Sequence, residues 1–246
     1  MIEKVEKKLK MDDYNREAVF TPAVVNLLFA AFFIICTLKD TLLTTESTIW
    51  WQTAAIIIAP ITVEVILFRF FMHIFREASK LFESFLYHKD HLYFPTTSML
   101  LLGDNSISQI QKKRIRQVLK IKYNITLPSK TSEEDDELEA RRAAKDAVAL
   151  MRKDVADNDD TMIRRKLKRY GMFRNFLGGA LFCLPICLTC WIVSLCLSSS
   201  STLTLSITLT TYIVLVVTDL LFTKNTAIDY AESLITTFDK LNYNEA

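Results

Sequence analysis

The most constraining feature of this sequence is the blocked distribution of its apolar residues. Four stretches, at residues 20–38, 50–71, 172–197 and 202–222, carry few charges, and each approaches or exceeds the ~20 residues that a helix needs to cross ~30 Å of hydrocarbon. A backbone inside a bilayer must satisfy its own hydrogen bonds, so such runs favour helices. The sequence therefore predicts an all-α integral membrane protein with four transmembrane helices.

The four runs form two pairs, because the polar links at residues 39–48 and 198–201 are too short for anything but hairpins. A charged segment of ~100 residues separates the pairs, which is the size of a small domain. We therefore expect five segments: an amphipathic N-terminal segment at 1–19, transmembrane hairpin 1 at 20–75, a helical cytoplasmic domain at 76–171 between the second and third spans, transmembrane hairpin 2 at 172–222 and a cytoplasmic C-terminal helix at 223–246.

Lysine and arginine near the ends of the spans predict the orientation. The two short links hold one such residue, Lys39, whereas the N-terminal segment holds five and the central segment many more. Because these residues resist translocation, both termini and the central domain are expected in the cytoplasm. This topology is that of a multi-pass protein of the inner (plasma) membrane.

Composition argues against several classes of function. The chain has only four glycines, so neither a Walker loop nor a dinucleotide fingerprint can be built and we expect no cofactor. His88, Asp90 and His91 are the only concentration of metal ligands, and nothing nearby completes a site, so no metal is expected. Nor does the sequence offer a nucleophile, base and orienter, so we do not expect an enzyme. The formal net charge of +2 does not favour a nucleic-acid partner.

Three of the charged residues within the predicted spans are candidates for gating. Arg69, near the end of the second span, can reach the interface, whereas Glu64 lies deeper and Asp219 lies near the far end of the fourth. A carboxylate inside a bilayer must be neutral, paired or directed at protein. Glu64 and Asp219 are therefore either part of an ion path or structural hydrogen-bonding groups.

Small and polar residues recur along one side of the third span. Asn175, Gly179, Cys183 and Cys187 follow one another at intervals of four residues. Such stripes allow backbones to approach closely, so we expect this face to pack against another helix or another copy of the chain.

Two basic groups in the central domain are candidates for binding anions. A helix over residues 106–123, with a capping box at Ser106 and Gln109, is expected to bury Ile110 and Ile115. A second helix is expected from a capping box at Thr131 and Glu134 to about residue 155. The opposite face of the first helix carries Lys112, Lys113, Arg116 and Lys120. A juxtamembrane cluster carries Arg164, Arg165, Lys166, Lys168 and Arg169. Both groups suit anionic lipid or a small anionic ligand.

Two hairpins flanking a helical insert resemble, in layout, small four-span bacterial membrane effectors and sensors of anti-phage defence. The resemblance implies an oligomer that senses a signal and alters membrane integrity, in contact with membrane lipids and with a cytoplasmic partner protein or a small anionic ligand. A channel-like effector is one expectation. A non-conducting scaffold or sensor that recruits a cytoplasmic partner is the alternative.

Overall fold

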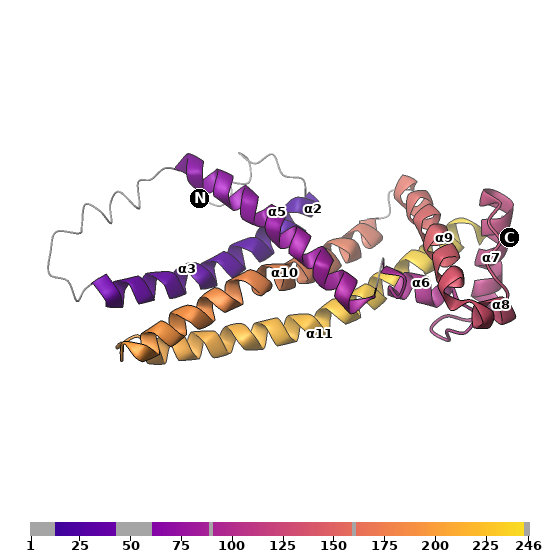
Figure 1. Ribbon diagram of the computed structural model, residues 1–246. Helices are drawn as coiled ribbons and strands as arrows, with labels where there is room; N and C mark the ends of the chain where they lie inside the picture. The colour runs from indigo at the N-terminus through magenta and orange to yellow at the C-terminus, as the bar shows by residue number, and fades with distance from the viewer. Residues whose placement is uncertain (1–12, 43–60, 89–90, 159–160, 244–246) are drawn as a thin grey trace. The chain divides into compact units, whose positions relative to one another are not determined.

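The computed structural model describes residues 13–42, 61–88, 91–158 and 161–243, and these residues form helices and no strand (Figure 1). The prediction of an all-α protein is therefore confirmed for this part of the chain. The elements in order are α2 (Asp13–Asn15), the π-helical η1 (Arg16–Phe20), α3 (Thr21–Leu42), α5 (Ile61–Leu86), α6 (Pro95–Leu100), α7 (Gln109–Tyr123), α8 (Lys130–Asp135), α9 (Glu137–Asp157), α10 (Thr161–Cys196) and α11 (Thr202–Leu241).

Three helical stretches among the described residues are long and apolar enough to cross a membrane. They are Arg16–Leu38, which comprises η1 and most of α3, and the long helices α10 and α11. Residues 50–60 of the second predicted span lie outside the described residues, and residues 61–71 begin α5. A membrane protein is therefore indicated, whereas the second predicted span, and with it the layout of four spans in two hairpins, stays a prediction.

The chain divides into two compact units. One, here called the apolar unit, comprises the residues up to Phe82 together with Gly171–Phe222; the other, the polar unit, comprises Glu83–Tyr170 together with the residues from Thr223 onward. Residues 223–243, which the sequence separated as a C-terminal segment, thus belong to the same unit as the central domain. Helices α5, α10 and α11 each contribute residues to both units.

The core of the apolar unit is built from α3, α5, α10 and α11. Most of its buried side chains are small, as expected where helices approach closely, or aromatic. Phe33 and Tyr212 are the largest fully buried members, and Tyr212 stacks on Phe29 with 4.4 Å between ring centroids. The buried members are Ala23, Ala30, Phe33, Phe75, Ala180, Cys183, Cys187, Leu205, Leu209 and Tyr212.

The polar unit has its own hydrophobic core, to which α6, α7, α9, the first turns of α10 and the end of α11 contribute. On α9 the buried residues recur at helical spacing, from Ala140 through Ala144, Ala147 and Met151 to Val155. They pack in one cluster with Ile115 and Leu119 of α7 and with Ala231, Leu234, Ile235 and Phe238 of α11.

The helix caps differ from those predicted. Ser108, and not Ser106, caps α7 by accepting a hydrogen bond from the Gln111 backbone at 3.2 Å, because the Ser106 N–H donates to Asp104 Oδ1 in a turn. Most of the helix predicted from Thr131 to about residue 155 is present, but its cap and its continuity are wrong: Ser129 caps a short α8, and Asp136 then caps a separate α9.

Candidate functional site

Asn175 is a buried polar residue that links three helical elements of the apolar unit. Its Nδ2 donates to the carbonyl oxygen of Ala18 in η1 at 2.6 Å, and its Oδ1 accepts a hydrogen bond from Ser79 Oγ of α5 at 2.7 Å. Asn175 is 2% exposed and Ser79 is fully buried. A buried amide costs free energy unless its donor and acceptor are both used, and here both are.

Asn26 of α3 makes a second link of the same kind, to the residue of α10 that follows Asn175. Its Nδ2 donates to the carbonyl oxygen of Phe176 at 3.1 Å, and its Oδ1 accepts a hydrogen bond from the Tyr212 hydroxyl. Asn26 and Tyr212 are both fully buried. The two asparagines together connect η1, α3, α5, α10 and α11 through side-chain hydrogen bonds.

Glycines permit these contacts by allowing backbones to approach closely. A Cβ atom on Gly178 would lie 2.3 Å from the carbonyl oxygen of Phe75, and one on Gly179 would lie 2.5 Å from Asn26 Nδ2. No side chain larger than hydrogen fits Gly178 without a backbone shift. Cys183 and Cys187 lie further along the same side of α10, in the apolar core.

The structure thus brings the predicted packing stripe, Asn175, Gly179, Cys183 and Cys187, to the interior of a single chain. Ser79, Asn26 and Tyr212 were not predicted. Asn26 was detectable in principle, because an asparagine in the middle of an otherwise apolar span calls for a partner. The identity of that partner is not encoded locally.

Asp219 is buried in the wall of an apolar pocket of the apolar unit. The pocket has a volume of about 280 Å³, and the Asp219 side chain is 7% exposed. Arg69, in contrast, is exposed on α5, and the side chain of Glu64 lies outside the described residues. The other pocket residues come from α3, α10 and α11: Thr21, Pro22, Val25, Met172, Phe173, Phe176, Leu215, Thr218 and Phe222.

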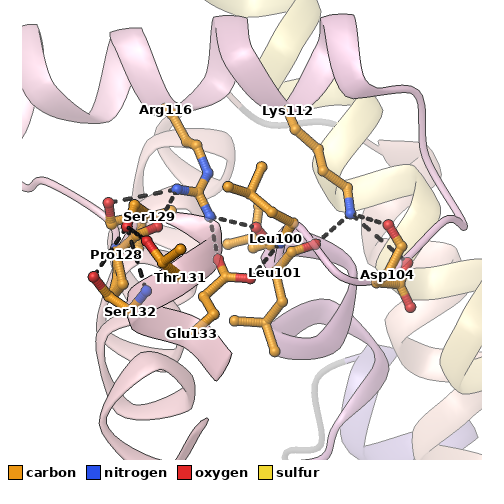
Figure 2. A network of polar contacts seen from close by, with 12 residues as sticks. Leu100, Leu101, Asp104, Lys112, Arg116, Pro128, Ser129, Thr131, Ser132 and Glu133 are labelled. Atoms are coloured by element: carbon orange, nitrogen blue, oxygen red, sulfur yellow. Dashed lines mark hydrogen bonds and ion pairs between the residues drawn. The ribbon is translucent and has the colours of Figure 1, made fainter. Parts of the chain in front are cut away.

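The basic face predicted on α7 is not a single exposed face. Lys112 is 1% exposed, and its Nζ donates to the carbonyl oxygens of Leu101 and Asp104 (Figure 2). Burial lowers the pKa of the Lys112 ammonium, although the nearby carboxylates of Asp104 and Glu133 oppose this shift. Ile110, expected in the core, is instead 71% exposed.

Arg116 is held in the same network one turn further along α7. It donates to Glu133 Oε1 at 2.6 Å and to the carbonyl oxygen of Pro128 at 2.5 Å, while Glu133 Oε2 accepts from the Leu102 N–H at 2.7 Å (Figure 2). Lys112 and Arg116 therefore join α7 to the loop after α6 and to α8. Their donors bind this chain's own oxygen atoms, which argues against the two as ligand contacts.

The pocket beside this network does not favour an anion. It has a volume of about 410 Å³ and is lined by four acidic residues, Asp104, Glu133, Glu134 and Glu137, but by only two basic ones, Lys130 and Arg141. Like charge would repel an anionic ligand here. Lys113 and Lys120 are exposed on α7, and their role as ligand contacts stays a prediction.

The juxtamembrane cluster lies in the first turns of α10. Arg164, Arg165 and Arg169 are exposed, whereas Lys166 and Lys168 are half-buried, and Lys166 Nζ donates to Ser233 Oγ at 2.5 Å. Most of the cluster is thus accessible to an anionic partner such as lipid headgroups.

A buried carboxylate that was not predicted lies near the histidines. Glu83 is 8% exposed, accepts a hydrogen bond from the Tyr170 hydroxyl at 2.6 Å and lies 3.9 Å from His91 Nδ1. Burial and, secondarily, Glu83 raise the pKa of Tyr87 to about 12. Asp90 lies outside the described residues, and no trio of metal-binding side chains occurs within them.

The buried polar groups of both units hold helices together through side-chain hydrogen bonds to backbone and to one another. Such interiors have discrete, not continuously adjustable, arrangements. The chain matches no protein-family model, and no curated protein or solved structure is detectably similar to it. Function is accordingly inferred from these residues and their contacts.

Proposed function

We propose that this chain is an oligomeric inner-membrane effector or channel-like protein whose polar unit senses a ligand or partner and whose apolar unit then alters membrane integrity. Anti-phage defence is the biological setting that the resemblance in layout to four-span effectors implies. The proposal requires two arrangements of the bundle that differ by only a few kcal/mol, so that a signal can shift their populations.

The observation that carries the proposal is that α10 and α11 each supply side chains to both hydrophobic cores. On α10, Ile163 and Tyr170 belong to the core of the polar unit, and Cys183 and Cys187 to that of the apolar unit. On α11, Leu205, Leu209 and Tyr212 precede Ala227, Tyr230 and Phe238 in the same way. A ligand that repacks one core therefore acts on helices that the other core also uses.

Buried polar groups in the apolar unit offer the second arrangement. A bundle of purely apolar helices has no directional interactions to exchange, whereas Asn26, Asn175 and Asp219 can change partners. Asp219, in its pocket, is the residue whose replacement we expect to change conductance most.

Reconstitution of the purified full-length protein into vesicles with a trapped dye tests the proposal. We expect release of dye, and we expect Asp219→Asn to change the rate. The matched control is Thr211→Val, since Thr211 is exposed on the same helix and its hydroxyl donates to the Ile207 carbonyl oxygen of its own helix at 2.9 Å. Induced expression in bacterial cells, followed with a membrane-potential dye, supplies the cellular ligands that vesicles lack. Tight vesicles and an unchanged potential would together reject the effector function.

The expected orientation is testable separately. The basic cluster at Arg164–Arg169 favours a cytoplasmic polar unit, with both termini on that side. Alkaline phosphatase fused after Ala246 is then expected to be inactive, and a fluorescent protein at the same point to be bright. The reverse pattern would place the polar unit outside the cell.

A non-conducting scaffold that recruits a cytoplasmic protein is the second candidate, and one observation favours it. Ile110 and Ile121 are 71% and 68% exposed, and at a separation of eleven residues they lie on one face of α7. Two exposed isoleucines on one face of a helix are available for contact with a partner protein. If the protein is a scaffold, the double substitution Ile110→Lys and Ile121→Lys will abolish its function. Vesicles that contain the wild type and vesicles that contain the variant will both retain the dye.

A further inference from the structure

Helix α5 has an exposed apolar stripe. Leu67, Phe70 and Leu81 are 48%, 58% and 74% exposed. At 100° per residue, these three positions lie within about 60° of one another around the helix. The stripe is continued between them by Ile74, which is half-buried.

The side of α5 away from this stripe is predominantly cationic. Arg69, Arg76 and Lys80 are exposed there, together with His73. Among the α5 residues whose burial the structure describes, the one exposed acid is Glu77, which lies between the stripe and the cationic side and accepts a hydrogen bond from Lys80 at 2.6 Å. An aromatic and aliphatic face beside a face rich in arginine and lysine is typical of helices that lie in a membrane interface.

A third side of α5 packs on α10, and this contact indicates how deep α5 lies in the membrane. Ser79 Oγ donates to Asn175, and the carbonyl oxygen of Phe75 lies where a side chain of Gly178 would be. Asn175 and Gly178 follow the last basic residue of α10, Arg174, by one and four positions. At 1.5 Å per residue the contact with α10 extends about 6 Å past the last charge. Interfacial helices bury their apolar faces about 5–10 Å into the boundary between headgroups and acyl chains.

We propose that the segment of α5 from Leu67 to Leu81 is a lipid-binding surface, with its apolar stripe among the acyl chains and Arg76 and Lys80 at anionic headgroups. The surface is distinct from the juxtamembrane cluster of α10. The proposal rests on α10 crossing a bilayer and is independent of whether the protein conducts. A second copy of the chain is the competing occupant, but it does not account for the cationic side or for the depth of the contact.

Tryptophan quenching by brominated phospholipids tests the contact in the full-length protein reconstituted into vesicles. Phe70→Trp and Leu81→Trp introduce reporters on the stripe, and His73→Trp is the matched control on the cationic side. The signal of the native tryptophans is subtracted with the parent protein. With bromine near the headgroup end of the acyl chain, we expect at least about twofold more quenching for the two stripe reporters than for the control, as burial of that face requires.

The headgroup preference is tested with brominated phosphatidylglycerol against brominated phosphatidylcholine. We expect anionic lipid to quench Leu81→Trp more strongly, and Arg76→Gln with Lys80→Gln to reduce this preference about tenfold. Lys145→Gln with Lys153→Gln removes the same charge from exposed positions of α9 and is expected to leave the preference unchanged. Quenching equal to that of the His73→Trp reporter would overturn the proposal, as would unquenched stripe reporters with efficient cross-linking between Leu81→Cys copies. An equal response to both lipids would overturn its headgroup part.

Discussion

Ser79 and Asn175, 96 positions apart in the sequence, are joined by a hydrogen bond of 2.7 Å between Ser79 Oγ and Asn175 Oδ1 in the interior of the apolar unit. Asn175 also donates to the Ala18 carbonyl oxygen, so one side chain ties α10 to α5 and to η1. Polar contacts between membrane helices contribute about 0.6 kcal/mol on average and up to about 1.7 kcal/mol.

We predict that Ser79→Ala and Asn175→Ala destabilise the protein non-additively. Each is expected to lower the free energy of unfolding by about 1 kcal/mol, and the double variant by less than the sum, because both singles remove the same bond. Unfolding in mixed micelles with increasing denaturing detergent measures the four proteins of the cycle. Strict additivity would show that the two residues do not interact.

The close contact at Gly178 predicts a large effect of a small side chain. Gly178→Ala places a methyl group 2.3 Å from the Phe75 carbonyl oxygen, a backbone atom that cannot rotate away. Overpacking of this kind costs about 1–3 kcal/mol, and we expect the thermal midpoint to fall accordingly. Gly103→Ala is the control, since a Cβ there meets nothing within 4 Å. Equal effects of the two substitutions would contradict this contact.

Replacement of Lys112 is expected to destabilise the polar unit. Lys112→Met keeps the length of the side chain but leaves the carbonyl oxygens of Leu101 and Asp104 without this donor, at a cost of about 2 kcal/mol. Lys113→Met, on an exposed neighbour, is expected to change stability by no more than about 0.5 kcal/mol. If Lys112 instead binds an anionic ligand and not its own chain, its replacement will leave the stability of the ligand-free protein unchanged.

Asp154 predicts an acid-sensitive contribution to stability. Burial opposes its ionisation, but hydrogen bonds from Asn242 at 3.0 Å and Lys122 at 3.0 Å outweigh this, so the pKa of Asp154 is lowered from 3.8. A lowered folded-state pKa means that the stabilisation is present above the unfolded value and is lost as the pH falls through the folded value.

The stability difference between the wild type and Asp154→Asn is therefore expected to be constant near neutral pH and to shrink below about pH 4. Thermal unfolding across an acid titration measures it. Asp157→Asn, an exposed acid on the same helix, is the control. A difference that persists unchanged at the lowest pH would exclude this linkage.

Local patterns were sufficient for the class of fold. Hydropathy and helical spacing are properties of neighbouring residues, so the apolar stretches at residues 20–38, 172–197 and 202–222 and the periodic core of α9 could be recognised without knowing their partners. The same patterns misplaced the caps of α7 and α9, because several serines, threonines and aspartates near each start could accept the bond and only the turn geometry selects one.

The sequence by itself determined that this chain is helical and that long segments of it suit a bilayer, because both follow from summed local preferences. The tertiary structure decided which polar side chains face one another. Lys112 is a basic residue on a charged helix, and only the carbonyl oxygens of Leu101 and Asp104 make it part of an interior. Asn26 and Tyr212 likewise form their hydrogen bond because α3 and α11 approach each other in the fold. A hydrogen bond needs both groups in place, and the spacing of the two residues along the chain does not predict it.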